Sequence, residues 1–340
     1  MKQPVRPLLI SLLLAGAGAA NATFSIVAVD PITDEVGSAV ATCVNINSLG
    51  SFVSRFAPGK GAINAQSLVS ITNLENGQDR LLDHDSADEV LDWLLSNDEN
   101  GTPGQRQYAI VSIATYTNDV VTAHFTGDDN TSFAGSLNGP DYAIAGNILL
   151  EEEVLLDMQA AFTTSSGWLG DRLMATLQAA KRPRADRRCP NTSALAAYIG
   201  VSRRGDQPDA PYLRLDVRSP NSLVEPIDLL QDTFDDFKTA NFAVDTDDDG
   251  IPDAIDNCTL LANPGQQDTD EDGYGNRCDA DFSQSCIHNF LDLGIFRSLF
   301  FSQGTQADLN SDGVVNAVDL GLFRSLYFQE PGPSAFGFCP

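Results

Sequence analysis

Residues 23–30, TFSIVAVD, and residues 35–41, EVGSAVA, are two short runs of apolar, β-branched and small side chains. Residues 30–35, DPITDE, lie between them and have the composition of a turn. The pattern predicts a β-strand over 24–29, a turn over 30–35 and a second strand over 36–44. The folded part of the chain therefore begins with strand, turn and strand.

Strand and helix patterns alternate after this opening. A third strand starts at 61–66, and a helix follows in which Ser86 is the N-cap and Glu89 completes a capping box. Further strands are predicted at 107–113, 120–125, 142–145, 195–201 and 212–217, and further helices at 151–162, 170–181 and 226–237. This order favours a layered α+β domain over 23–240, with helices packed on sheets.

Residues 1–22 have the pattern of a secretory signal peptide. Lys2 and Arg6 precede the short apolar run 8–15, and Ala20-Asn21-Ala22 is a small-x-small cleavage site. The alternative is a buried N-terminal helix. The run is too short to cross a bilayer, and no later stretch approaches 18 apolar residues. We therefore expect a secreted protein, extracellular or at the cell surface, with no transmembrane segment after signal removal.

Cleavage after Ala22 would make Thr23 the first residue of the mature chain. Its α-amino group, with a pKa near 8, could then take the proton from its own hydroxyl and turn that hydroxyl into a nucleophile. The alternative is that Thr23 is simply the first residue of a strand.

The opening motif also resembles that of a known family. Residues 23–30 and 35–41, together with GKGAINAQ at 59–66, YAIAGNIL at 142–149 and PIDLL at 226–230, resemble the domain of unknown function ten-twenty-eight family. That family is placed with the N-terminal-nucleophile (Ntn) hydrolases, which have a four-layer αββα fold. The resemblance implies this fold and a possible amidohydrolase chemistry, and it makes Thr23 the expected nucleophile. It does not imply a substrate; for such chemistry we expect a small amide or peptide-like one.

Amide hydrolysis through Thr23 also needs hydrogen-bond donors for the developing oxyanion. Asn147 is the first candidate because it follows Gly146 where a strand leads into a helix; its alternative role is the N-cap of that helix. Asn64 and Gln66 are further candidates on one face of the third strand, or else polar positions in the sheet. The segment 186–189, DRRC, resembles a family segment whose charges would orient the amine or a substrate carboxylate; a surface salt bridge is the alternative.

The chain is strongly acidic, with 47 Asp and Glu against 20 Lys and Arg and a net charge of −27. This balance argues against nucleic acid as a partner. The acidity is concentrated in residues 245–340, where carboxylates and amides repeat with the spacing of twelve-residue calcium loops. The predicted Ca²⁺ ligands, with Ile251, Tyr274 and Val314 contributing backbone oxygens, are Asp245, Asp247, Asp249, Ile251, Asp253 and Asp256; Asp268, Asp270, Asp272, Tyr274, Asn276 and Asp279; and Asp308, Asn310, Asp312, Val314, Asn316 and Asp319.

Two further resemblances divide this tail. Residues 245–280 resemble thrombospondin type 3 repeats, through the sequence DNC at 256–258, the NP at 263–264 and the CD at 278–279. Residues 281–301 align with 308–328 at a period of 27, and the two loop-helix copies resemble a dockerin module over 281–340. The first copy has serines at loop positions 3 and 5 and Cys286 in place of glycine, so its calcium site is in doubt. A dockerin implies a cohesin-like receptor; the alternative is a calcium-braced terminal domain without a partner.

Six cysteines in an exported chain favour disulfides, and six allow 15 pairings. Domain order alone suggests Cys43–Cys189, Cys258–Cys278 and Cys286–Cys339. The function that we expect is an exported Ntn-type amidohydrolase, carried on a calcium-binding tail that tethers it to a complex or surface. The alternative is a non-catalytic secreted protein on the same fold that binds calcium and partners.

Overall fold

The computed structural model describes residues 23–114, 119–303, 305–337 and 339. The expected signal peptide, residues 1–22, lies outside the described residues. In the described part of the chain, no helix has both the length and the apolar character needed to cross a membrane.

Two antiparallel sheets form the domain that spans residues 23–241. The six-stranded sheet has the order β10 (Leu213–Arg218), β9 (Ala196–Ser202), β2 (Glu35–Thr42), β1 (Thr23–Asp30), β8 (Tyr142–Asn147) and β7 (Gly135–Asn138). The four-stranded sheet has the order β3 (Ser54–Ala57), β4 (Gly61–Ser67), β5 (Arg106–Ile113) and β6 (Val120–Thr126). The opening motif therefore supplies β1 and β2, which lie in the middle of the larger sheet.

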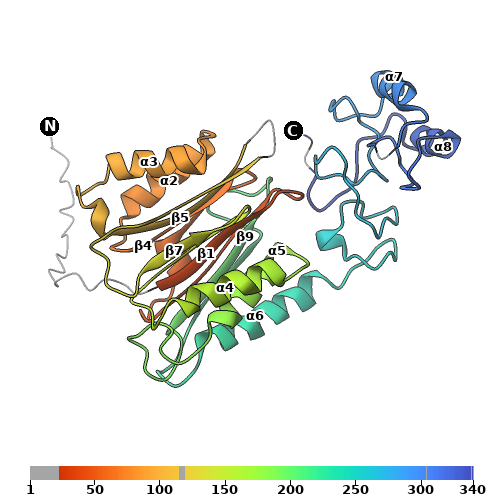
Figure 1. Cartoon of the computed structure of the whole chain (residues 1–340). Helices are drawn as coiled ribbons and strands as arrows, with labels where there is room; N and C mark the ends of the chain where they lie inside the picture. The colour runs from red at the N-terminus through yellow and green to blue at the C-terminus, as the bar shows by residue number, and fades with distance from the viewer. Residues whose placement is uncertain (1–22, 115–118, 304, 338, 340) are drawn as a thin grey trace, which may run out of the picture.

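The sheets pack face to face and carry helices on their outer sides (Figure 1). Val27, Val40 and Val111 belong to the apolar cluster between the sheets. The outer face of the larger sheet is covered by α4 (Glu153–Thr164), α5 (Leu169–Ala180) and α6 (Pro226–Asn241). The outer face of the smaller sheet is covered by α2 (Ile71–Leu82) and α3 (Ala87–Ser96). The prediction of an α+β domain with helices packed on sheets is confirmed.

Most of the predicted elements lie within two or three residues of their expected bounds. Ser86 caps α3 and Glu89 completes the capping box, as predicted. Five elements of this domain were not predicted: α1 (Leu49–Val53), β3, α2, the 3-10 helix η1 (Pro103–Gln105) and β7. The sequence of α2 contains Gly77, which disfavours a helix. A Cβ on Gly77 would lie 2.6 Å from Ile63 Cδ1, so the glycine lets α2 pack closely on β4.

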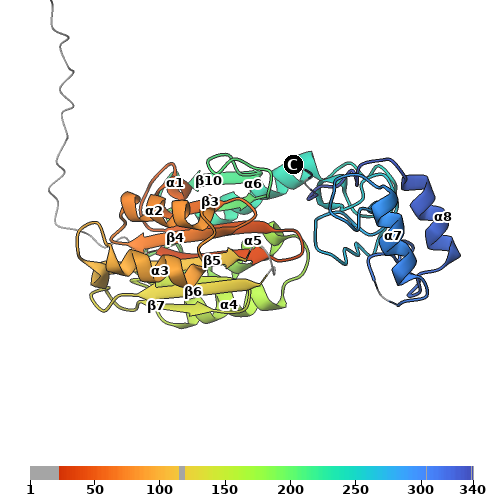
Figure 2. The ribbon, with the colours of Figure 1, turned by 90° about the horizontal axis from the view of Figure 1, so that it is seen from above.

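The tail has little regular structure. Residues 242–289, all of them described, contain only the short 3-10 helix η2 (Asp253–Ile255), after which come α7 (Phe290–Leu299) and α8 (Ala317–Leu326). A small apolar cluster joins the two helices and includes Phe282, Phe296 and Phe323. Figure 2 shows α7 and α8 side by side at the end of the molecule remote from α2 and α3.

Three disulfides are present, and their pairing is the predicted one. Cys43 bonds to Cys189, Cys258 to Cys278, and Cys286 to Cys339. The first joins the end of β2 to a loop of the same domain, and the other two lie within the tail.

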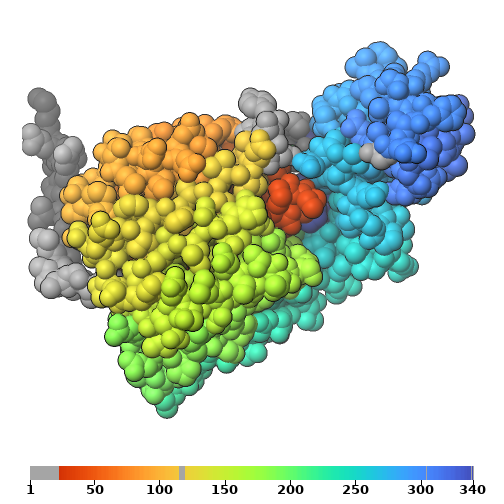
Figure 3. All heavy atoms as spheres, in the orientation of Figure 1, coloured from red at the N-terminus to blue at the C-terminus, as the bar shows by residue number. Residues whose placement is uncertain are grey.

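Arg203, which follows β9, connects the domain to the tail. Its Nη2 donates to the carbonyl oxygen of Ala254 at 2.7 Å, and its Nε donates to Glu35 Oε1 at 2.9 Å. Its guanidinium also lies over the rings of Tyr212 and Phe336, at 3.5 and 5.3 Å from their centroids. The contact lies beside the turn between β1 and β2, which Figure 3 shows in red next to the tail.

Candidate functional site

Thr23 is the first residue of β1 and has a strand on each side. It is paired with Thr42 of β2 and with Asn147 of β8. Side chains alternate along a strand, and Val27 of β1 lies in the cluster between the sheets, so Thr23 and Ser25 share that inward side. Thr23 is 2% exposed. Its hydroxyl lies 3.4 Å from the hydroxyl of Thr42.

Polar side chains from both sheets meet at this end of the inter-sheet layer. Gln66 Nε2 donates to the carbonyl oxygen of Thr23 at 3.2 Å and to Gln107 Oε1 at 2.7 Å. Ser25 Oγ donates to Gln66 Oε1 at 2.7 Å, and Asn147 Nδ2 donates to Gln107 Oε1 at 3.0 Å. We call Thr23, Ser25, Gln66, Gln107 and Asn147 the inter-sheet polar network. All five residues are buried.

Asn147 ends β8 with its side chain inside this network. Its alternative role as a helix N-cap is wrong, because α4 is preceded by Glu152 and Asn147 bonds across to β5. Asn147 Oδ1 is buried without a hydrogen-bond partner among the described residues. The amide nitrogen carries a second N–H besides the one that bonds to Gln107. A carboxamide next to Thr23 therefore keeps hydrogen-bonding capacity that the described residues do not use.

Asn64 and Gln66 face the same side of β4, as predicted, but they serve different clusters. Asn64 Oδ1 accepts from Ser38 Oγ at 2.8 Å and from Ser54 Oγ at 2.7 Å. Its Nδ2 donates to the carbonyl oxygen of Ile26 at 3.2 Å. These bonds give Asn64 a part in joining the sheets, whereas Gln66 contacts Thr23 directly.

Gln107 joins the inter-sheet polar network without having been predicted from the sequence. It stands opposite Gln66 in the pairing of β4 with β5, and its Nε2 donates to the carbonyl oxygen of Gly146 at 2.8 Å. The only available signal was a polar residue near the start of a strand that is mainly apolar.

Asp186 lies beyond the N-terminal end of β1. The chain segments that follow β2 and β8 extend beyond Thr23, and both contact Asp186. Cys43, after β2, donates its amide N–H to Asp186 Oδ2 at 2.7 Å, and Leu149, after β8, forms a β-bridge with Asp186. Arg188 holds the same carboxylate through Nη2, at 2.9 Å. A salt bridge is therefore present, with the Asp186 side chain completely buried and that of Arg188 partly exposed. The Cys43–Cys189 disulfide attaches the loop to β2.

The tail contains four twelve-residue loops, at 245–256, 268–279, 281–292 and 308–319, and all four have the same backbone form. The residues at positions 4 and 6 have positive φ in each; they are Asp248 and Gly250, Glu271 and Gly273, Gln284 and Cys286, and Ser311 and Gly313. The first carboxylate accepts the amide N–H of position 6 in every loop, from Gly250 to Asp245 at 2.9 Å, for example, and from Gly313 to Asp308 at 2.8 Å. The calcium-loop spacing thus corresponds to one repeated turn.

Carboxylates gather inside the first two loops. Oxygens of Asp245, Asp247 and Asp249 lie within 4.8 Å of one another, and so do oxygens of Asp268, Asp270 and Asp272. Burial and the neighbouring carboxylates raise the pKa of Asp270 to about 8 and that of Asp272 to about 7. Asp247 Oδ2 and Asp256 Oδ2 are buried and have no hydrogen-bond partner among the described residues. Such a donor set matches what Ca²⁺ binds.

The predicted ligands at loop position 9 make hydrogen bonds within their own loops. Asp253 accepts from the amide and the hydroxyl of Thr246, at 2.7 and 2.5 Å. Asn276 Oδ1 accepts from the Thr269 amide at 2.8 Å, and its Nδ2 donates to the Thr269 hydroxyl oxygen at 2.7 Å. In the third copy, Asn316 caps α8 and donates to the carbonyl oxygen of Val314. These side chains therefore close the loops. In the first two loops position 9 bonds to position 2, and in the third copy position 9 caps the helix that follows.

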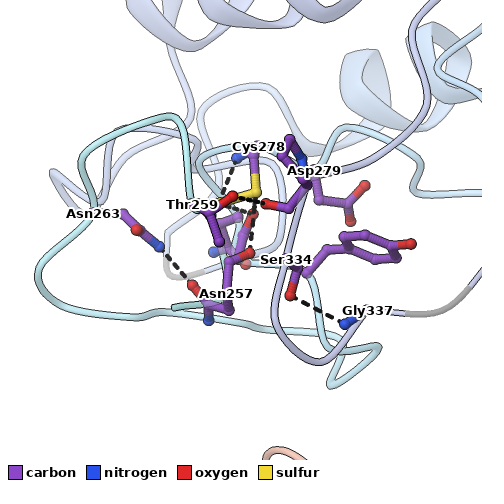
Figure 4. Close-up of a disulfide and its surroundings, with 12 residues drawn as sticks. Asn257, Thr259, Asn263, Cys278, Asp279, Ser334 and Gly337 are labelled. Atoms are coloured by element: carbon purple, nitrogen blue, oxygen red, sulfur yellow. Dashed lines mark hydrogen bonds between the residues drawn. A yellow bond between two sulfur atoms is a disulfide. The ribbon is translucent and has the colours of Figure 1, made fainter. Parts of the chain in front are cut away.

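Asp279 and Asp319 lie at the ends of their loops, and Asn310 and Asp312 lie inside the loop 308–319. Asp279 accepts from Asp281 N at 2.8 Å and lies beside the Cys258–Cys278 disulfide (Figure 4). Asp319 accepts from the amides of Asn310 and Asn316, at 3.2 and 2.8 Å, and Asn310 Nδ2 donates to Asp312 at 2.8 Å.

The loop at 281–292, which departs from the calcium pattern, is closed by hydroxyl groups. Ser283 Oγ and Ser285 Oγ donate to Asp281 Oδ1 at 3.3 and 3.1 Å. Two donors therefore stand where the other loops place acceptors, which fits the doubt about a calcium site here.

The fold and the position of Thr23 define a two-sheet α+β domain whose central strand begins at a buried threonine. The model of the Family of unknown function (DUF1028) matches residues 23–226, and the chain belongs to this family. The solved structure of protein SPO2555 from Silicibacter pomeroyi, described as DUF1028, is 27% identical, with a TM-score of 0.51. The match covers 65% of this chain and 92% of that one. No protein with a curated description matches the chain.

Proposed function

We propose that the protein is an exported amide hydrolase of the Ntn class, with Thr23 as its nucleophile and a small amide or peptide-like compound as its substrate. The observation that carries the proposal is the place of Thr23, at the start of a central strand and facing the layer between the sheets beside the inter-sheet polar network. Two sheets with helices on both outer faces also fit the αββα architecture of that class.

In the proposed reaction, removal of residues 1–22 leaves the α-amino group of Thr23 next to its hydroxyl. The amine takes the hydroxyl proton while Oγ1 attacks the substrate carbonyl carbon, and the carbonyl oxygen becomes an oxyanion. The uncommitted N–H of Asn147 donates to that oxyanion. The C–N bond then breaks, the leaving amine takes the proton, and water hydrolyses the ester left on Thr23.

Two other groups position Thr23 in this proposal. Gln66 holds its carbonyl oxygen, at 3.2 Å. Asp186 places a buried carboxylate between the extensions of β2 and β8, past the end of β1 where the new α-ammonium group would lie. Because a negative charge favours the ammonium form, Asp186 would orient the amine and raise its pKa, which lowers the fraction of free amine at neutral pH.

Labelling with a β-lactone probe tests the proposal. The exported wild-type protein should form a covalent adduct, Thr23→Ser should keep it, and Thr23→Ala should lose it. Thr122→Ala is the matched control. Thr122 lies on β6, outside the network, and its hydroxyl donates to the carbonyl oxygen of Gly139. If wild type and Thr23→Ala react alike, the proposal fails and the non-catalytic alternative is favoured.

We further propose that the tail binds three Ca²⁺ ions, one in each loop that keeps the acidic pattern. The buried, unpartnered oxygens of Asp247 and Asp256 support this for the first loop. The ligands would be Asp245, Asp247, Asp249, Ile251 O and Asp256; Asp268, Asp270, Asp272, Tyr274 O and Asp279; and Asp308, Asn310, Asp312, Val314 O and Asp319. The side chains at position 9 would close the loops instead.

Tethering to a cohesin-like receptor is the role that we propose for residues 281–340. Between α7 and α8 lies a groove of about 520 Å³, whose lining repeats at the period of 27: Leu293 and Leu320, Phe296 and Phe323, Arg297 and Arg324. Calorimetric titration with a cohesin-like module should show binding in Ca²⁺ and none after chelation. Failure to bind in Ca²⁺ would leave a calcium-braced terminal domain.

A further inference from the structure

A second polar cavity lies at the edge of the domain, away from Thr23. It has a volume of about 410 Å³ and lies between the α1–β3 segment and strands β9 and β10. Figure 2 shows α1, β3 and β10 along the same edge of the domain. The lining includes Ser51, Ser54, Arg55, Tyr198, Asp209 and Arg214. The volume is in the range of small-molecule sites.

The two arginines keep hydrogen-bonding capacity for a ligand. Arg55 Nη2 lies 3.8 Å from Glu75, and Arg214 Nε lies 3.5 Å from Asp216, both longer than the ~2.8 Å of a charge-assisted hydrogen bond. Arg55 Nη1 is held by the carbonyl oxygens of Ser51 and Ser54, at 2.7 and 2.9 Å. Arg214 Nη2 also donates to Ser51 Oγ. The protein therefore fixes both cations, and each has a carboxylate partner at the longer distance, which leaves N–H groups of both side chains for a ligand.

Tyr198 contributes its hydroxyl to the same wall. The residue is 1% exposed, and its hydroxyl makes no hydrogen bond within the residues that the structure describes. The chain makes room for the ring with glycines: a Cβ on Gly50 would lie 2.3 Å from the ring, and one on Gly200 would lie 2.1 Å from the hydroxyl. Burial raises the pKa of Tyr198, so the phenol stays a donor. A ligand oxygen in the cavity would accept a hydrogen bond from this hydroxyl.

We propose that this cavity binds the carboxylate of a small organic acid, with Arg55, Arg214 and Tyr198 as donors. A monoanion suits the site better than a phosphate dianion, because Asp209 lines the same cavity and repels a second negative charge. The wall is tied to the domain core, since Ser54 Oγ donates to Asn64 Oδ1 at 2.7 Å. The site shares no residue with the inter-sheet polar network, so it does not depend on catalysis by Thr23.

Ligand-observed NMR on the mature full-length protein tests the site, with L-lactate and inorganic phosphate as separate probes. Lactate should bind saturably, and phosphate should bind more weakly. Tyr198→Phe removes one hydrogen bond to a charged group and should weaken lactate binding about tenfold, as should Arg214→Gln.

Tyr108→Phe is the matched control. Tyr108 is equally buried, but its hydroxyl accepts from Asn73 Nδ2 at 2.8 Å on the other side of the smaller sheet. This variant should bind lactate like wild type. Absence of saturable lactate binding, or equal binding by wild type, Tyr198→Phe and Arg214→Gln, would overturn the site. Tighter binding of phosphate than of lactate would overturn the assignment to a carboxylate.

Discussion

Removal of calcium should unfold residues 245–340 and leave residues 23–241 folded. The reason lies in the carboxylate clusters of the tail. Oxygens of Asp268, Asp270 and Asp272 lie within 4.8 Å of one another. Two unit charges at that distance repel by about 3.5 kcal/mol when the effective dielectric constant is about 20. Three such pairs give about 10 kcal/mol for one charged cluster.

This repulsion is as large as the whole stability of a typical domain, about 5–15 kcal/mol. Without a cation, the cluster must take up protons or come apart. The pKa values of about 8 for Asp270 and about 7 for Asp272 express the same conflict, because burial and the neighbouring carboxylates both favour the neutral acid. A bound Ca²⁺ removes the conflict, and its binding free energy becomes folding free energy of the tail.

Limited trypsin digestion followed by mass spectrometry measures the effect. The tail has three basic residues, Arg277, Arg297 and Arg324, and cleavage after them should become fast in EGTA and stay slow in Ca²⁺. Both tryptophans, Trp93 and Trp168, lie in residues 23–241, so an unchanged unfolding transition in tryptophan fluorescence would report that this domain stays folded.

Neighbouring aspartates supply a matched pair of variants. Asp247→Asn removes a proposed ligand and should raise the calcium concentration needed for protection. Asp248→Asn changes an exposed residue at loop position 4 and should have no such effect. Asn tolerates the positive φ of this position, so the backbone should stay as it is. Equal digestion in EGTA and in Ca²⁺ would refute the proposed dependence of the tail on calcium.

Two further predictions concern residues 23–241. Burial, partly offset by Arg204, raises the pKa of Asp34 to about 6. The folded state therefore holds the proton more tightly than the unfolded state, and stability from this group is greatest below pH 4 and is lost as the pH rises through 6. The stability of wild type relative to Asp34→Asn should fall by up to about 3 kcal/mol between pH 4 and pH 7 in urea titrations; a flat difference would contradict this. Replacing Cys43 and Cys189 by serine opens a link across 146 residues and should cost about 5 kcal/mol in the same assay; a loss under about 1 kcal/mol would contradict the expectation.

Local sequence signals predicted much of the fold, because the signals and the structures they specify lie close together. The Ser86 capping box starts α3, and the pattern of residues 107–125 gives the β5–β6 hairpin. The pairing of β1 with β8, which places Asn147 opposite Thr23, involves residues more than a hundred positions apart, and no local pattern specifies it. The helix α2 was not predicted because Gly77 has a low helix propensity. The glycine is there because it allows close packing of α2 on β4.

The candidate site was predictable only in part, for the same reason. Thr23 stood out through its position after a predicted cleavage site. Asp186 was indicated only by the resemblance of the segment 186–189 to the family, and Gln107 gave almost no signal. The contacts of both residues come from strands and loops that meet only in the folded domain. The calcium loops are the opposite case, because each is a single turn whose positive-φ residues and first carboxylate are adjacent in sequence.

N-terminal sequencing of the exported protein tests the central claim most directly, since the proposed chemistry requires the α-amino group and the hydroxyl on one residue. We predict that the mature chain begins at Thr23. A mature chain that begins at any other residue, even one position earlier, would place a peptide bond on the Thr23 nitrogen or remove the threonine, and would contradict the claim.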